Sequence, residues 1–249
     1  MFDKTDNRAA KREKLKEFYL EIKNCKSCRL GELRTNFVFG SGNSNAEILL
    51  IGEAPGKNED IQGKPFVGQA GKLLDDLLAS IGFGRNDVFI ANVLKCRPPQ
   101  NRDPDITEIN TCKGYLFKQI EIINPLIICT MGKYSTQLIL ETSEIISRLR
   151  GKVFEKNGKT VIPINHPAAA LYTPSRTELL REDFKRLKQI YDVKSKNRGF
   201  SGDSNAENKG TESAEPADSI AKEGFEDLND RSMQEVNVPD DKKEQLGLF

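Results

Sequence analysis

The chain has 249 residues, of which 37% are hydrophobic and 30% are charged, and its formal net charge is +1. This length suits one or two domains with a substantial core, and no run approaches the roughly 18 apolar residues of a membrane span. The charge is uneven: residues 1–192 carry 30 Lys and Arg against 24 Asp and Glu, about +6, whereas residues 193–249 carry 8 against 13, about −5. A mildly basic body suits a polyanionic partner.

The predicted elements begin with a helix. Leu15, Phe18, Tyr19 and Ile22 have the spacing of one helix face. Short segments rich in β-branched residues then predict four strands, at residues 47–51, 88–92, 126–130 and 160–164. Strands alternating with helices predict an α/β fold, with a mostly parallel sheet covered on both faces.

Helical patterns separate these strands. An apolar face predicts a helix at residues 73–81, and two more are predicted at 133–140 and 175–191. A further helix is expected to start after Asp103-Pro104, because Asp is a good N-cap and Pro fits the first helical turn.

The carboxyl ends of the strands are where ligands bind in such sheets. Here the unusual sequence follows the strands: Gly52-Glu53-Ala54 after the first, Asn92 at the end of the second, Gly132 after the third and His166 after the fourth. The site is therefore expected at this edge of the sheet.

Several side chains there have a functional and a plain interpretation. His166 is the single histidine and heads a loop of small residues, although a lone histidine is usually structural. Glu53 lies on a glycine-flanked turn that suits a ligand or an ordinary surface loop. Phe66 could stack on a flat ring or belong to the core. The Asn92 amide can donate and accept at once, which suits an amide-like heterocycle.

Four cysteines have the pattern of a metal site. Cys25-x-x-Cys28 is joined by Cys96 and Cys112, and four thiolates suit either zinc or an iron–sulfur cluster. The plain alternative is a set of ordinary buried cysteines. Cys129, in the middle of a strand, is expected to be a core residue. The first 18 residues contain no apolar stretch typical of a secretory signal, so we expect a cytoplasmic protein without disulfides.

The composition changes after residue 192. Residues 193–244 are rich in polar and charged residues and are expected to form a disordered acidic linker. The chain nevertheless finishes on an apolar cluster at residues 245–249.

At this point the motifs resemble those of family 4 uracil-DNA glycosylases, over roughly residues 14–192, in order and without large gaps. The matching segments are Cys25–Cys28, GEAPG at 52–56, GKPFVGQAGKLL at 63–74, NVLKCRPPQNRDP at 92–104, Cys112 and HPAAAL at 166–171.

The resemblance implies a three-layer α/β/α fold around a four-stranded sheet, a glycosylase domain at residues 1–192, and a [4Fe-4S] cluster on Cys25, Cys28, Cys96 and Cys112. It implies that Phe66 stacks on uracil, that Asn92 binds its polar edge, that His166 hydrogen-bonds O2, and that Gly52, Glu53 and Ala54 line the pocket. Asn101 is implied to assist Glu53.

The function implied is that of a monofunctional glycosylase: it hydrolyses the N-glycosidic bond of deoxyuridine in DNA, releases uracil and leaves an abasic site, which initiates base excision repair. We expect a monomer without membrane association. Two alternatives stay open: a protein that binds uracil-DNA without turnover, even covalently, and a scaffold that recruits proteins to DNA through its tail.

Two positions depart from the family 1 enzymes. Ala54 replaces their water-orienting Asp, which leaves Glu53 as the nearest carboxylate. Gly56 replaces the Tyr that excludes thymine, so discrimination against the methyl group is expected from Glu53 or neighbouring loops.

The last five residues resemble the bacterial sliding-clamp-binding motif, which carries Gln, Leu, a small or acidic residue, Leu and Phe. Gln245, Leu246, Leu248 and Phe249 match it, and Gly247 departs mildly from the commonest third residue. A terminal apolar peptide of this kind is expected to dock its Leu and Phe anchors into a groove of the replicative clamp, although a random apolar terminus is the simpler alternative.

Overall fold

Strands that are buried on both faces form the core of this protein. The computed structural model describes residues 4–200, with side chains from residue 9 to residue 197. Four parallel strands lie side by side in the order β3 (Phe89–Asn92), β2 (Ile48–Gly52), β4 (Ile127–Met131) and β6 (Lys159–Ile164). Almost every residue in them is buried, as expected for a parallel sheet covered on both faces. The predicted α/β fold and its four strands are confirmed.

The sheet has six strands rather than the four expected. Two short antiparallel strands close its edges: β1 (Ser41–Gly42) pairs with β3, and β5 (Phe154–Lys156) pairs with β6. With two and three residues, they are too short to show an alternating pattern in the sequence. The one sequence signal for the β5–β6 hairpin is its turn, Asn157-Gly158, and both residues have the positive φ that a tight hairpin turn requires.

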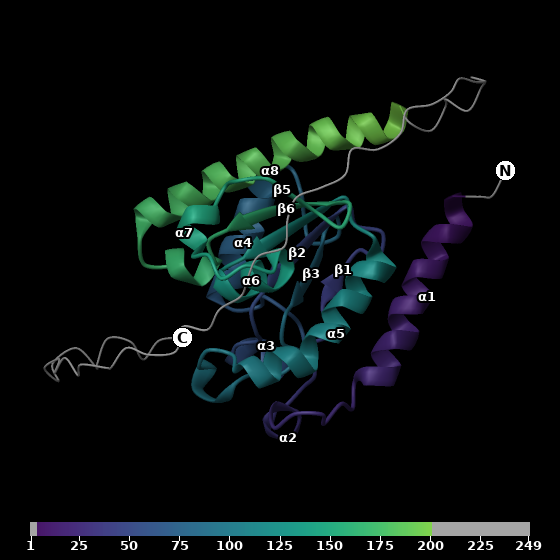
Figure 1. The fold of residues 1–249 in the computed structure, drawn as a ribbon, viewed down its shortest axis with the longest axis vertical. Coiled ribbons are helices and arrows are strands. Elements are labelled where there is room, and N and C mark those ends of the chain that lie inside the picture. The colour runs from purple at the N-terminus through teal and green to yellow at the C-terminus, as the bar shows by residue number, and fades with distance from the viewer. Residues whose placement is uncertain (1–3, 201–249) are drawn as a thin grey trace, which may run out of the picture. The chain divides into compact units, whose positions relative to one another are not determined.

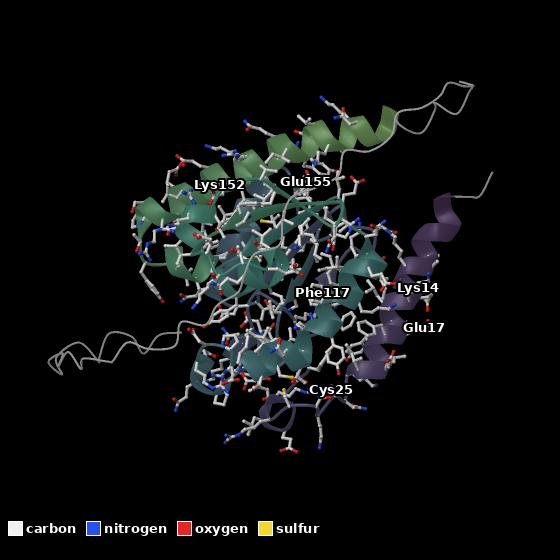
Figure 2. All side chains as sticks on the ribbon, viewed as in Figure 1. Lys14, Glu17, Cys25, Phe117, Lys152 and Glu155 are labelled. Atoms are coloured by element: carbon white, nitrogen blue, oxygen red, sulfur yellow. The ribbon has the colours of Figure 1, made fainter. Side chains whose placement is uncertain are left out.

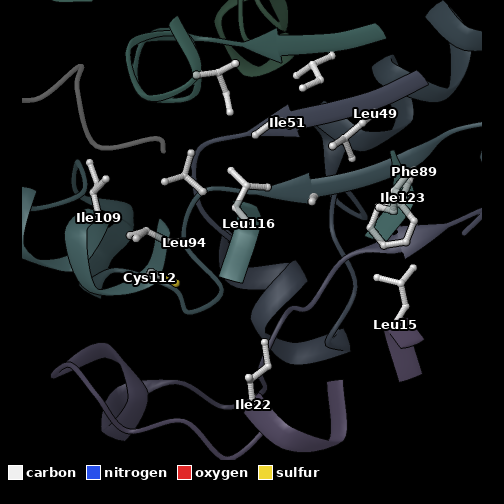
Figure 3. Packing of buried hydrophobic residues seen from close by; sticks show 14 of the residues in the cluster. Leu15, Ile22, Leu49, Ile51, Phe89, Leu94, Ile109, Cys112, Leu116 and Ile123 are labelled. Carbon is white, nitrogen blue, oxygen red and sulfur yellow. The ribbon is translucent and has the colours of Figure 1, made fainter. Parts of the chain in front are cut away.

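Helices cover both faces of the sheet (Figure 1). One hydrophobic cluster joins alternate residues of the strands to α1 (Lys4–Ile22), α5 (Ile106–Ile123) and α6 (Lys133–Leu140). The other cluster joins the remaining strand residues to α4 (Gln69–Ser80) and α8 (Pro174–Phe200). Figure 3 shows the first cluster, with Leu15 of α1 and Ile123 of α5 close to Phe89 of β3.

The remaining described elements are short. They are α2 (Leu30–Leu33), α3 (Lys57–Gln62), α7 (Ile146–Leu149) and two 3-10 turns at Pro99–Asn101 and Pro167–Ala170. No helix within residues 4–200 is long and apolar enough to cross a membrane.

The start of α5 differs from the prediction. Its N-cap is Asp105, two residues after the Asp103 expected from the sequence, and Asp105 Oδ1 accepts a hydrogen bond from the Thr107 amide at 2.8 Å. Glu108 completes a capping box by accepting from the Asp105 amide at 2.9 Å. Asp103 is thereby left outside the helix. Helix α8 continues through residues 193–200, which were predicted to belong to a disordered linker, and residues 201–249, including the terminal peptide 245–249, lie outside the described part of the chain.

Candidate active site

The carboxyl ends of the parallel strands bring the predicted residues together. Gly52 and Asn92 are paired in register at the ends of β2 and β3. Beyond β4 and β6, a Cβ at Gly132 would lie 3.2 Å from the His166 Cβ, so these two segments are in close contact. Phe66 reaches the same place from the loop before α4, where its ring contacts both His166 and Gly52.

Asn92 presents an unsatisfied acceptor to this site. Its side chain is buried, and within residues 9–197 its Oδ1 is the buried side-chain atom that lacks a hydrogen-bond partner. Because buried polar atoms nearly always have a hydrogen-bond partner, we expect this oxygen to bind a donor that the protein itself does not supply. A Cβ at Gly52 would lie 2.4 Å from the same oxygen, which shows how closely the strand end approaches it.

Phe66 and His166 form adjacent walls. Their ring centroids lie 5.5 Å apart and their planes are inclined by 29°, a stacked arrangement. The Phe66 side chain is 5% exposed.

The protonation state of His166 follows from its surroundings. Its Nδ1 accepts a hydrogen bond from the Ala168 amide at 3.2 Å, so Nδ1 carries a lone pair and the proton of the neutral ring is on Nε2. Burial lowers the His166 pKa to about 4, against a smaller opposite effect of Glu59. At neutral pH the imidazole is therefore an uncharged donor through Nε2.

The Glu53 side chain is protonated more readily than an ordinary glutamate. Burial and the neighbouring Asp103 raise its pKa to about 7, and Lys133 opposes them. Tyr134 donates a 2.7 Å hydrogen bond to Asp103 Oδ2, which holds that carboxylate near Glu53. These neighbours could not be predicted from the sequence, because Asp103 precedes α5 whereas Lys133 and Tyr134 lie in α6.

Asn101, predicted to assist Glu53, lies in a 3-10 turn with a positive φ of 54°. Its Oδ1 accepts a hydrogen bond from Arg97 Nε at 2.7 Å. Ala54 packs against the hydrophobic cluster on the α1 and α5 side.

The four predicted cysteine ligands pack around a single hydrophobic cluster. Cys96 and Cys112 are buried members of it, and the half-buried Cys25 and Cys28 pack against it. Figure 2 places Cys25 beside the lower end of α5. Cys129 lies apart from them, buried in β4 within the other cluster, as predicted for a core residue.

Hydrogen-bond donors point at these sulfur atoms. Arg34 Nη1 donates to Cys96 Sγ at 3.0 Å, and the Tyr115 hydroxyl donates to Cys25 Sγ at 3.1 Å. Such contacts favour thiolates over thiols. Among the described residues, no group of three or more His, Cys, Asp or Glu side chains is arranged to hold a single metal ion.

Three residues that hydrogen-bond around the site were missed by the sequence interpretation. Lys95 is fully buried beside Cys96 and Cys112, and burial lowers its pKa to about 8. Glu59 and Arg85 hold the backbone around Phe66. Lys95 lies within the continuously buried run 88–96, directly after the apolar pair Val93-Leu94, which was the one local signal; no pattern marked the other two.

Comparison with known proteins agrees with this geometry. Residues 39–190 match the model of the uracil DNA glycosylase superfamily. A type-4 uracil-DNA glycosylase of Archaeoglobus fulgidus is 48% identical over 186 residues, covering 72% of this chain and 94% of the relative. Those of Saccharolobus solfataricus and Thermotoga maritima are 50% and 42% identical, covering 70% and 72% of this chain and 85% and 96% of the relatives. The chain therefore belongs to the uracil DNA glycosylase superfamily and, within it, to the type-4 uracil-DNA glycosylases.

Proposed function

We propose that this protein hydrolyses the N-glycosidic bond of deoxyuridine in DNA, releasing uracil and leaving an abasic site for base excision repair. The observation that carries the proposal is the unpaired Asn92 Oδ1, buried beside an aromatic wall and a neutral histidine donor. A flat base with an N–H donor and carbonyl acceptors complements these groups. Reaching it requires the nucleotide to leave the duplex stack.

Recognition of uracil rests on Asn92 and Phe66. Asn92 Oδ1 accepts from uracil N3–H. Cytosine carries a lone pair at this ring position, so the same oxygen repels it. Phe66 stacks on the face of the base, and Gly52 and Ala54 border it. Discrimination therefore depends on a single buried acceptor, because an unsatisfied or repelled buried group costs about 1–3 kcal/mol.

His166 stabilises the departing base. Cleavage of the bond between uracil N1 and the sugar C1′ leaves negative charge on uracil, spread over N1 and its carbonyl oxygens. The His166 Nε2–H donates to O2, where this charge develops, without first losing a proton of its own. One such donor contributes roughly 3–4 kcal/mol to transition-state stabilisation.

Glu53 positions the water that attacks C1′. Its carboxylate accepts a hydrogen bond from the water; as the water oxygen bonds to C1′, one water proton passes to Glu53 and the electron pair of the broken N1–C1′ bond stays on uracil. A pKa of about 7 makes Glu53 a base matched to neutral pH. We assign Asn101, whose side chain Arg97 holds, the role of assisting Glu53 from the 3-10 turn at residues 99–101.

The decisive experiment is release of free uracil from a uracil-containing oligonucleotide, analysed together with the DNA strand. Catalytic turnover with an intact abasic strand supports the proposal. A covalent protein–DNA adduct with no turnover would support the binding protein, and DNA binding without release would support the scaffold. Cleavage of the strand by a lysine Schiff base would exclude a monofunctional enzyme.

We also propose that Cys25, Cys28, Cys96 and Cys112 hold a [4Fe-4S] cluster. Arg34 and Tyr115 donate hydrogen bonds to the sulfur atoms of Cys96 and Cys25, which supports thiolates at these two positions. Each cysteine of such a cluster binds a different iron, so the sulfur atoms need not converge on one ion. The cluster would cross-link the segment after α1, the loop after β3 and helix α5.

Metal analysis tests this assignment. Anaerobically purified protein should contain about four irons per chain and absorb broadly near ~400 nm. Stoichiometric zinc without iron would overturn the proposal.

Finally, we propose that residues 245–249 bind the replicative sliding clamp, and that the enzyme acts in the cytoplasm on newly made DNA. Support comes from the sequence, where Gln245, Leu246, Leu248 and Phe249 match a clamp-binding peptide. Deleting the five residues should abolish clamp binding and leave excision from free oligonucleotides unchanged. Clamp binding by the truncated protein as strong as that of the full chain would refute it.

A further inference from the structure

Phe66 has a strained backbone. Its φ is 53°, in the left-handed region that a bulky residue seldom adopts. Such a conformation persists only where the surrounding structure enforces it, and it is often found at functional sites.

Arg85 holds the carbonyl side of Phe66. From the loop between α4 and β3, its guanidinium donates to the carbonyl of Pro65 through Nη1 at 3.1 Å and to that of Phe66 through Nη2. Its Nε donates to Asp75 Oδ1 at 2.6 Å, which fixes the adjacent edge of the group. The planar guanidinium therefore binds two successive carbonyls in one orientation.

Glu59 holds the amide side. From α3, its Oε1 accepts from the amides of both Val67 and Gly68 at 2.9 Å. Its Oε2 accepts from the Gly56 amide at 3.1 Å, which ties the same carboxylate to the turn after β2. Hydrogen bonds to a charged acceptor are stronger than neutral ones, so the peptides after Phe66 are firmly placed.

Helix α4 closes the third side. A Cβ at Gly71 would lie 1.8 Å from the Phe66 carbonyl oxygen and 2.2 Å from its carbonyl carbon. Only glycine allows the helix to approach so closely. The Phe66 backbone is thus confined by a cation, an anion and a helix, and its ring is directed against His166 and Gly52.

We propose that Arg85 and Glu59 are positioning residues that hold the Phe66 ring ready to stack on the base before uracil arrives. The inference rests on the proposed function, in which Phe66 is the stacking platform. A ring already fixed in the bound orientation loses little freedom on binding. Removing either charge would let Phe66 relax to an ordinary backbone conformation and withdraw the ring.

A double-mutant cycle tests whether Arg85 acts through Phe66. Arg85→Gln should weaken free-uracil binding about tenfold, the scale of a lost stacking contact. Arg85→Lys keeps the charge but lacks the forked guanidinium, so its uracil affinity should lie between those of the wild type and Arg85→Gln. In a Phe66→Ala background, Arg85→Gln should change the affinity less than twofold. Equal losses in both backgrounds would show that Arg85 serves the fold alone and would overturn the proposal, as would wild-type affinity in Arg85→Gln.

The matched control is Lys152→Gln, which removes one positive charge from an exposed residue between α7 and β5. Figure 2 shows Lys152 beside α8, well separated from the region of α3. Its uracil affinity should equal that of the wild type.

Hydrogen exchange supplies a readout that does not depend on uracil. In the ligand-free protein, Glu59→Gln and Arg85→Gln should each accelerate exchange of the Val67 and Gly68 amides, with exchange in the β2 strand unchanged. Unaltered exchange in both variants would overturn the proposed positioning of Phe66 by Arg85 and Glu59, even if the enzyme is active. If instead the wild type releases no uracil while exchange responds as expected, the proposed function fails, but the positioning of the Phe66 backbone by Arg85 and Glu59 is supported.

Discussion

The Lys95 ammonium donates a 2.8 Å hydrogen bond to the backbone carbonyl of Asn92, and a second, of 2.6 Å, to Gln119 Oε1. Gln119 in turn donates to the Phe39 carbonyl at 2.9 Å. A fully buried cation therefore joins the strand end that carries the pocket amide to helix α5, directly beside the cysteines.

Replacing this cation should be costly. Lys95→Met keeps the volume but leaves two buried acceptors without a donor, at about 1–3 kcal/mol each. We expect the free energy of unfolding to fall by about 2–6 kcal/mol in urea titrations, with reduced iron content. Lys118→Met, an exposed change one residue before Gln119, should stay within about 0.5 kcal/mol. A Lys95→Met protein as stable as the wild type would contradict this account.

The pH dependence of excision should report Glu53. Because burial and Asp103 raise its pKa to about 7, the carboxylate that orients water is the minor form at pH 6 and the major form at pH 8. We predict that kcat/KM rises with pH through an inflection near 7. His166, with a pKa of about 4, stays neutral between pH 5 and 9 and should add no inflection there.

Single-turnover rates across this range, for the wild type and Glu53→Gln, measure the effect. The variant should be slower and should lack the inflection, because its amide does not titrate. The same inflection in both proteins would assign it to another group.

The parallel strands were predictable because each is a short, β-branched run buried on both faces. Their common direction then places Gly52, Asn92 and His166 at one edge, so a large part of the site followed from the fold class. The edge strands β1 and β5 escaped prediction because two or three residues cannot display a period.

The groups that tune the site could not be predicted in the same way. Arg85 contacts Phe66 from 19 residues away, and Lys95 contacts Gln119 from 24 residues away. Such pairs depend on how α4 and α5 pack against the sheet. The α5 cap shows a local limit as well: Asp103 and Asp105 are both good caps, and Glu108 decides between them by completing the capping box at Asp105.

His166 should be the largest single contributor to the chemical step. His166→Ala removes the Nε2–H donor and is expected to slow single-turnover excision by a factor on the order of 10². His166→Gln, which keeps an N–H donor, should retain more activity. Thermal unfolding of both variants checks that the fold is intact, and full activity in a stable His166→Ala protein would exclude the proposed role.

Gly52 should be irreplaceable for catalysis although its backbone is ordinary. It has extended strand geometry that alanine adopts without strain, so any effect arises from the added methyl group. That Cβ would lie 2.4 Å from Asn92 Oδ1 and 2.7 Å from the Phe66 ring, closer than real contacts allow. Either group must move, and both contact uracil in the proposed mechanism.

We therefore predict that Gly52→Ala lowers kcat/KM at least about 10²-fold, while overpacking lowers the free energy of unfolding by about 1–3 kcal/mol. Gly114→Ala is the matched control, since a Cβ there meets nothing within 4 Å on helix α5. It should stabilise the protein by about 0.5–1 kcal/mol through helix propensity and leave excision unchanged. Uracil affinity and kcat/KM near wild-type values in Gly52→Ala would show that the base binds elsewhere than against Asn92 and Phe66.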